Sequence, residues 1–190
     1  MMIRIGIIGD IGSGKTFVAN NFGYPVFNAD YEVGLLYKKN KKIFFQLNKK
    51  LPKQITKFPI DKNEIIEAIF DDKKNLKKII NIVHKEVRKK LILFLKKNKN
   101  KKIVILDIPL LIENKIFNKK DILIFIDSKK KDIDKRIKKR PNFNSKLLSI
   151  FKKNQLNSNY KKKKSHFIIK NTFKKIPVKN EINKILSKIM

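Results

Sequence analysis

The strongest constraint on this chain is an octapeptide near its start, Gly9-Asp10-Ile11-Gly12-Ser13-Gly14-Lys15-Thr16. It matches the pattern G-x-x-x-x-G-K-[S/T] without a gap. The apolar residues 2–8 before it resemble a short buried strand, and residues 17–22 after it continue as an apolar-faced helix. Strand, glycine loop and helix therefore follow one another in the order that a phosphate-binding loop requires.

The residue types of this loop explain its chemistry. Glycines allow backbone N–H groups to approach phosphate oxygens closely, and the helix that follows directs its positive end at the same anion. We predict that residues 9–16 bind ATP, with Lys15 reaching the β- and γ-phosphates and the Thr16 hydroxyl holding Mg²⁺. A glycine-rich turn without a ligand is the alternative, and the full match between strand and helix argues against it.

Composition limits the size and metal chemistry of the protein. With 190 residues, 42% of them hydrophobic, we expect one nucleotide-binding unit with insertions. The chain has no cysteine and only two histidines, His84 and His166, so the expected ion is oxygen-bound Mg²⁺. No basic-then-apolar leader precedes the glycine loop, and no apolar run approaches the ~20 residues of a membrane span. We therefore expect a cytoplasmic protein that does not engage a membrane.

The formal net charge of +32 raises the possibility of nucleic-acid binding. Only four of the 48 basic residues are arginines, namely Arg4, Arg88, Arg136 and Arg140. Base-edge recognition depends heavily on arginine, and the lysines are spread over every segment without singling out one face. We favour a solvated lysine coat that attracts anionic metabolites, and we expect no specific nucleic-acid partner.

The hydrophobic pattern predicts an α/β fold, a P-loop NTPase-type parallel sheet flanked by helices. Further strands are predicted at residues 24–28, 102–107, 121–127 and 166–169. Residues 31–99 are helical in pattern, which is more than a crossover needs, and a closing helix is expected at 177–190. The predicted divisions are a core of residues 1–30, 101–135 and 165–190, a helical substrate-binding insertion at 31–100, and a small lid at 136–164.

Two carboxylates follow predicted strands and are candidates for the group that activates a phosphoryl acceptor. Asp30 and Asp107 both stand at a strand's carboxyl end, where ligands of open α/β sheets bind. A solvated or helix-capping aspartate is the alternative for each. Asp107 could instead assist Mg²⁺ through water.

Several other residues outside the loop admit two interpretations. Arg136 and Arg140 lie four apart on a helix predicted at 129–139, which Pro141 would stop, so they would share a face and could clamp the transferring phosphate. A surface charge pair is the alternative. His84 lies among apolar helix positions and by its pattern alone would be a packed histidine. Asp61 and Glu64 have the spacing of a capping box.

One motif in the chain is misleading. Residues 118–121, Asn-Lys-Lys-Asp, match the N-K-x-D guanine motif, but they precede a predicted strand and no D-x-x-G occurs in the chain. We interpret them as a turn.

Taken together, these residues resemble the dephospho-coenzyme A kinase family, and the similarity runs over nearly the whole chain. The matching segments are 9–16, Ala29-Asp30, Ile69-Phe70 with His84, the block Pro109-Leu110-Leu111-Ile112-Glu113-Asn114, the 136–140 helix, and Gln155 leading to 167–171. The P-L-L-x-E block is the most discriminating of them.

The resemblance implies an ATP-dependent phosphorylation of the ribose 3′-hydroxyl of dephospho-CoA. It implies that Asp30 is the base or orienter, that His84, Leu111 and Glu113 lie near the acceptor, and that Arg140 acts from the lid while Arg136 contacts the nucleotide. A monomer is favoured. Another small-molecule kinase of this fold, such as a nucleoside monophosphate kinase, stays open as an alternative, as does a nucleic-acid-associated ATPase.

The chain departs from the family pattern at two positions near the site. The family usually has glycine where Asp10 stands and aspartate where Asn28 stands. A carboxylate in the phosphate loop is expected to repel ATP unless its side chain points outward.

Overall fold

The polypeptide divides into two compact units in a computed structural model, which describes residues 2–140 and 143–190. The first unit contains the chain up to Asn28 together with Asn98–Met190, and the second is Ala29–Lys97. Pro141, predicted to stop a helix, lies outside the described residues.

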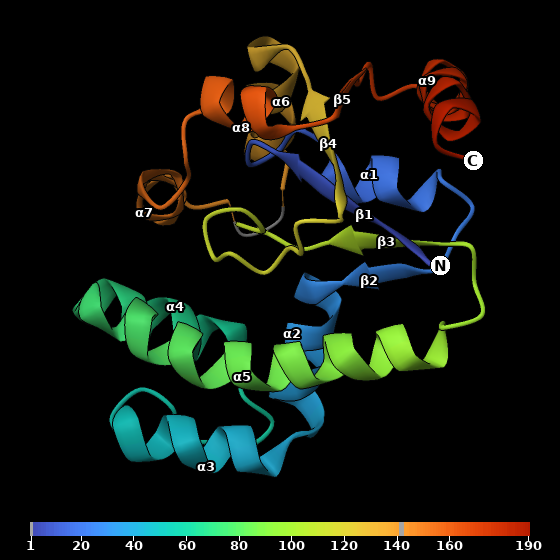
Figure 1. Ribbon diagram of the computed structural model, residues 1–190. Helices are drawn as coiled ribbons and strands as arrows, with labels where there is room; N and C mark the ends of the chain where they lie inside the picture. Colours follow the sequence, from blue (N-terminus) through green and yellow to red (C-terminus); the bar gives the residue numbers. More distant parts are fainter. Residues whose placement is uncertain (1, 141–142) are drawn as a thin grey trace. The chain divides into compact units, whose positions relative to one another are not determined.

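A parallel sheet of five strands forms the centre of the first unit as described (Figure 1). The strands are β1 (Ile3–Gly9), β2 (Val26–Asn28), β3 (Ile103–Asp107), β4 (Ile122–Asp127) and β5 (Phe167–Lys170). They lie in the order β2-β3-β1-β4-β5, and every neighbouring pair is parallel. The predicted fold class is confirmed.

The strand order predicts that ligands bind at the carboxyl end of the central strand, β1. After β1 the chain builds β2 and β3 on one side, then β4 and β5 on the other, so the topology switches around β1. Open α/β sheets bind ligands at such a switch point, outside the carboxyl ends of the strands. The glycine loop leaves β1 at this point.

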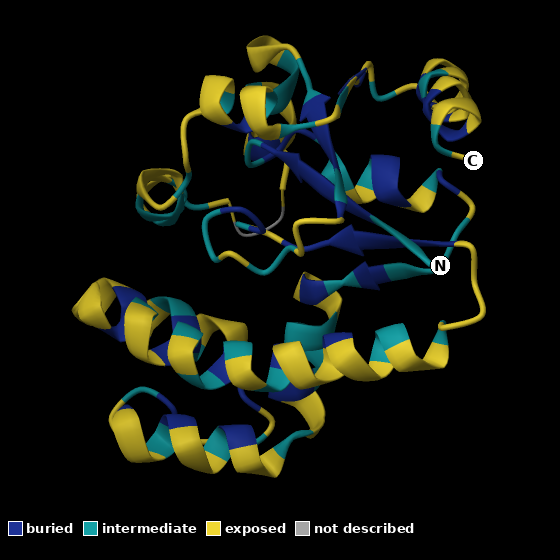
Figure 2. Cartoon of the chain, in the orientation of Figure 1, coloured by how far each residue is buried: buried dark blue, intermediate teal, exposed yellow. Residues whose placement is uncertain are grey.

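Alternate strand residues bury one face of the sheet in an apolar core. Ile5 and Ile7 of β1 are fully buried, and their counterparts on β3, β4 and β5 are Ile103, Ile105, Ile124, Ile126 and Ile169. The helices α1 (Lys15–Asn20) and α9 (Lys175–Ile189) cover this face with residues such as Val18 and Ile182 (Figure 1). In Figure 2 the inner strands β3, β1 and β4 are mostly coloured as buried, as expected for strands covered on both faces, whereas the outer strands β2 and β5 each have one buried residue.

The remaining helices of the first unit are α6 (Lys130–Lys138), α7 (Ser145–Lys153) and α8 (Ser158–Lys164). Helix α8 lies against β1 and β4. Helix α6 ends before Arg140, so our prediction that Arg136 and Arg140 share one helical face is wrong. The helix closes at the Lys139 C-cap, and the Arg140 N–H bonds the Ile137 carbonyl at 3.1 Å in a terminal turn.

The second unit is helical. It consists of α2 (Ala29–Lys39), α3 (Lys41–Lys50), α4 (Lys62–Asp71) and α5 (Lys74–Lys97), and α5 packs against each of the other three. Ile43 and Leu47 of α3 are fully buried, as the three-to-four-residue apolar spacing requires. None of the helices in the described ranges is both long and apolar enough to cross a membrane.

The predicted capping box at α4 forms only in part. The Asp61 carboxylate accepts the Asn63 N–H at 3.0 Å and caps the helix as expected. Glu64 instead accepts hydrogen bonds from the N–H and hydroxyl of Thr56, at 3.3 and 3.0 Å. The Glu64 carboxylate is thus bonded to Thr56, in the segment before α4. The part of the predicted capping box in which Glu64 accepts the Asp61 N–H is therefore wrong.

Candidate nucleotide-binding site

Two glycines give the loop the shape predicted from its pattern. Gly12 and Gly14 have φ angles of 85° and 84°, in the left-handed region that side chains disfavour. A β-carbon on Gly12 would lie 2.7 Å from Ile137 of α6, and one on Gly14 would collide with the Asn171 side chain. Both the backbone conformation and the close neighbours therefore require glycine.

Lys15 folds back over the loop. Its ammonium group donates to the carbonyl oxygens of Gly9, at 3.2 Å, and of Asp10, at 2.9 Å. These two carbonyls keep the Lys15 ammonium over the loop. The oxygens of a bound phosphate would replace them as its hydrogen-bond acceptors. The placement fits the predicted role of Lys15 as a phosphate ligand.

Thr16 is joined to the carboxyl end of the neighbouring strand. Its hydroxyl donates to Asp107 Oδ2 at 2.6 Å, and the Asn28 side-chain amide donates to the same oxygen at 2.8 Å. Asp107 is only 3% exposed, so its carboxylate depends on these donors. Hydroxyl and carboxylate oxygens are the ligands that Mg²⁺ prefers, and this pair fits a magnesium site.

The back of the loop is fixed by side chains from distant parts of the chain. The Ser13 carbonyl accepts hydrogen bonds from the Ser128 hydroxyl and the Asn171 amide, both at 2.8 Å. The Ile11 N–H donates to Gln155 Oε1 at 3.3 Å. The segments after β4, after β5 and after α7 therefore all hold the loop.

The Asp10 side chain turns to helix α8. Its two carboxylate oxygens accept from Lys161 Nζ at 2.7 Å and from the Ser158 hydroxyl at 2.6 Å. Burial by itself would raise the pKa of Asp10, but the hydrogen bonds from Lys161 and Ser158, with the positive charges of Lys161 and Lys15, lower it below its usual value. The loop therefore carries an ionised acid with its own cation.

The two arginines differ in their surroundings. The guanidinium carbon of Arg136 lies 4.2 Å from the centre of the Phe173 ring, and a β-carbon on Gly14 would lie 2.7 Å from the same ring. Arg136 therefore stacks on a ring that lies beside the glycine loop. Its contact with the nucleotide stays a prediction. Arg140 is exposed beyond the end of α6.

The P-L-L-x-E block forms a turn after β3. Leu111 is 1% exposed, and a β-carbon on Gly6 of β1 would lie 2.6 Å from its side chain. Glu113 Oε1 accepts the Leu156 N–H at 3.1 Å, so it joins this turn to the segment that also carries Gln155. A contact of Leu111 or Glu113 with an acceptor stays a prediction.

Asp30 and His84 belong to the helical unit. Asp30 is an exposed residue in the first turn of α2, and that helix begins directly after β2. His84 is half-buried on α5, and burial, followed by the charge of Arg88, lowers its pKa. Their predicted roles at the acceptor stay predictions.

The N-K-x-D match is a turn, as interpreted from the sequence. The Asp121 N–H bonds the Asn118 carbonyl at 2.9 Å, and the Asp121 carboxylate accepts the Asn118 N–H at 2.9 Å. That carboxylate also pairs with Arg4 at 2.9 Å. Asp121 thus closes a turn before β4.

Sequence reasoning gave no role to several residues that hold the loop. Ser128 carries no pattern that sets it apart, and Gln155 and Asn171 were recognised only as matching segments. Lys161 belongs to a run of four lysines within the predicted lid, yet it is 2% exposed. The packing of α8 against β1 and β4 decides which lysine of that run is buried.

The glycine loop, the Thr16–Asp107 contact and the switch point at β1 define a nucleotide-binding protein of the phosphate-loop class. The family model for dephospho-CoA kinase matches residues 3–175. The chain belongs to the dephospho-CoA kinase family.

Two curated relatives agree with this assignment over nearly their whole length. A dephospho-CoA kinase of Wolbachia sp. subsp. Brugia malayi is 32% identical, with 97% of each chain covered. The dephospho-CoA kinase of Rickettsia typhi is also 32% identical, over 99% of this chain and 98% of that protein.

Solved structures show the same fold. A crystal structure from Thermus thermophilus matches with a TM-score of 0.80 at 25% identity, over 100% of this chain and 98% of that one. Dephospho-CoA kinase from Campylobacter jejuni matches with a TM-score of 0.61 at 25% identity, over 98% of this chain and 96% of that one. Shikimate kinase from Bacteroides thetaiotaomicron, at 10% identity and a TM-score of 0.53 over 100% of this chain and 99% of that one, shares the fold alone.

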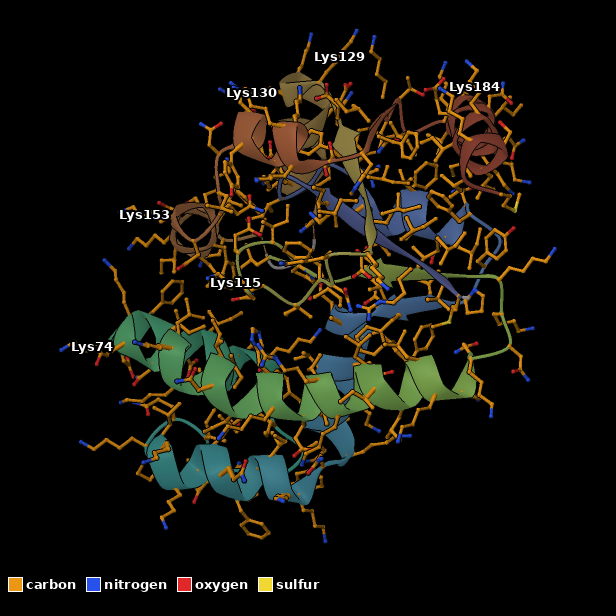
Figure 3. The ribbon with its side chains drawn as sticks, in the orientation of Figure 1. Lys74, Lys115, Lys129, Lys130, Lys153 and Lys184 are labelled. Carbon is orange, nitrogen blue, oxygen red and sulfur yellow. The ribbon has the colours of Figure 1, made fainter. Side chains whose placement is uncertain are left out.

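The lysine excess lies largely on the surface. Figure 3 labels six lysines from different elements and loops, and their side chains project away from the ribbon. All six are exposed: Lys74, Lys115, Lys129, Lys130, Lys153 and Lys184. This distribution supports the interpretation of a solvated coat.

Proposed function

We propose that this protein transfers the γ-phosphoryl group of ATP to the ribose 3′-hydroxyl of dephospho-CoA, the final step of coenzyme A synthesis. The observation that carries the proposal is a complete phosphate loop at the switch point of the sheet, in a chain that matches the family model over residues 3–175. The P-L-L-x-E block supports this acceptor over those of other kinases of the fold. A cytoplasmic location and a monomeric state stay predictions.

The phosphate loop binds the donor. Its backbone N–H groups hold the phosphates, and Lys15 exchanges its carbonyl partners for the β- and γ-phosphate oxygens. Thr16 and, through water, Asp107 would hold Mg²⁺, which when bound offsets negative charge on the phosphates. The short hydrogen bond between these two side chains orients the Thr16 oxygen before any ion arrives.

The acceptor hydroxyl needs a carboxylate that orients it and takes its proton. We assign this role to Asp30, because its side chain is exposed at the start of α2, directly after a strand of the sheet. Asp107 is less suited, since Oδ2 already accepts two hydrogen bonds and the residue is buried. Arg136 and Arg140 supply positive charge to the transferring group, and residues 136–164 act as a lid.

An acceptor panel tests the proposal. Purified protein with Mg²⁺ and ATP is offered dephospho-CoA, nucleoside monophosphates and shikimate, and product formation is followed by mass spectrometry. We expect phosphorylation of dephospho-CoA far above the others, and a fall of about a hundredfold or more in Lys15→Ala. Turnover with dephospho-CoA no faster than with buffer contradicts the proposal. A preference for a nucleoside monophosphate would show that the protein is a kinase of a different acceptor.

A further inference from the structure

The acid of the phosphate loop and the buried lysine of α8 form one cluster. Lys161 Nζ lies 2.7 Å from Asp10 Oδ1, and its side chain is 2% exposed whereas that of Asp10 is 37% exposed. The Ser158 hydroxyl, three residues earlier on α8, donates to the other carboxylate oxygen at 2.6 Å. Both oxygens of the acid are thus held by the same helix.

An unpaired acid at this place would oppose nucleotide binding. Two like charges a few ångströms apart repel each other, and the repulsion is several times stronger near a protein surface than in bulk water. Asp10 stands between Gly9 and Ile11 in the loop whose amides bind phosphate, so its charge lies close to the anion unless it is turned away and neutralised. The Lys161 ammonium does both.

Helix α8 is a firm support for this arrangement. Lys162 pairs with Asp127 at the end of β4 at 2.9 Å, and the Asn157 side chain caps the helix by accepting the Asn159 N–H at 2.8 Å. Lys161 extends to the loop from a helix that is tied separately to the sheet. The next two lysines, Lys163 and Lys164, are exposed.

We propose that Lys161 is a positioning residue for ATP binding, which holds the Asp10 carboxylate against α8 and neutralises it so that the phosphate loop keeps its affinity for the triphosphate. The inference rests on the proposed use of the loop as the ATP site. It adds to that site a residue that acts only through Asp10. The charge of Lys161 is needed because this chain carries an acid in the loop.

A double-mutant cycle on ATP affinity tests the proposal, because a positioning role requires the two residues to be coupled. ATP binding is measured directly by titration calorimetry for the wild type, Lys161→Met, Asp10→Asn and the double variant. Lys161→Met weakens ATP binding about tenfold or more, equivalent to ~1.4 kcal/mol, because it exposes the phosphates to an uncompensated carboxylate. In the Asp10→Asn background the same substitution costs at most a small part of that loss.

Further variants separate positioning from structural support. Lys161→Arg keeps the charge and restores most of the ATP affinity. Lys163→Met, the matched control, removes an exposed lysine of the same run and leaves ATP affinity near that of the wild type. Asp10→Asn lowers the thermal unfolding midpoint, because it leaves a buried ammonium without its counterion, yet it binds ATP at least as tightly as the wild type.

Three results overturn the inference. They are an unchanged ATP affinity in Lys161→Met, an equal loss in both backgrounds, and a loss in Asp10→Asn as large as in Lys161→Met. Should Lys161→Met fail to fold, the Asp10→Asn and Lys161→Arg measurements decide the question by themselves. The titration needs no acceptor, so a protein that binds ATP but does not phosphorylate dephospho-CoA contradicts the proposed function and leaves this test intact.

Discussion

The phosphate loop and the helical unit Ala29–Lys97 are stabilised in different ways. The loop depends on polar contacts with residues more than a hundred positions away, such as Ser128, Gln155 and Asn171. The helical unit depends on apolar packing around α5 and on local caps such as Asn40, which accepts the Ile43 N–H at 3.1 Å.

This difference predicts how each region responds to mutation. The backbone N–H groups of the phosphate loop must point at the phosphates, and hydrogen bonds fix that orientation because they are directional. A helical bundle must exclude water, and apolar side chains do so without strict geometry. Substitutions near the loop should therefore change turnover more than stability, and core substitutions in the helical unit should do the reverse.

The largest effect is expected for Lys15→Ala. Removal of the ammonium takes away a group that meets the γ-phosphate in the transition state, so kcat should fall by about a hundredfold or more. Initial rates with saturating ATP and dephospho-CoA measure it. Lys184→Ala, an exposed lysine with only a surface pair to Glu181, is the control and should turn over normally. A similar rate for Lys15→Ala and the control would contradict a role of Lys15 in phosphoryl transfer.

Asp30→Asn tests whether the helical unit also contributes to the reaction. We expect turnover to fall about a hundredfold, because the amide cannot take the proton of the acceptor hydroxyl. Glu32→Gln, on the same first turn of α2, removes an equal charge and should have little effect. Near-normal turnover of Asp30→Asn would assign the role to Asp107.

A methyl deletion in the helical core should affect stability alone. Ile43 is fully buried, so Ile43→Val should lower the free energy of unfolding by about 1 kcal/mol and leave kcat unchanged. Urea denaturation and steady-state rates measure the two quantities. The control is Ile92→Val, because that side chain is 53% exposed. A loss of kcat without a loss of stability would break the distinction between the two regions.

The smallest effect concerns His84. Burial and Arg88 lower its pKa in the folded protein below the usual 6.5, so protonation favours the unfolded chain. Its stabilising contribution is complete above pH 6.5 and is lost as the pH falls from there through the folded pKa. Thermal unfolding midpoints at pH 7.5 and 5.5 should therefore differ less in His84→Asn than in the wild type. Lys85→Asn, beside it and exposed, should behave as the wild type, and an equal pH dependence in His84→Asn would contradict the expectation.

Local patterns identified the loop and most of the elements around it. Residues 9–16 predicted a strand, a turn and a helix because the glycines and Lys15 have no other common use in that order. The apolar periods predicted each strand of the sheet within two residues of its observed bounds. Helix α6 ends at Lys138, one residue before the predicted bound, and Arg140 lies beyond it in a terminal turn.

The sequence by itself determined the fold class, the phosphate loop and the family, because each depends on residue types at short, fixed spacings. The tertiary structure decided which polar residues hold the loop, since Ser128, Asn171 and Lys161 meet it only when the strands align. It also decided that one lysine of a charged run is buried. A charged group can be buried only beside a counterion. For Lys161 the counterion is Asp10, which lies beside α8 only in the packed structure.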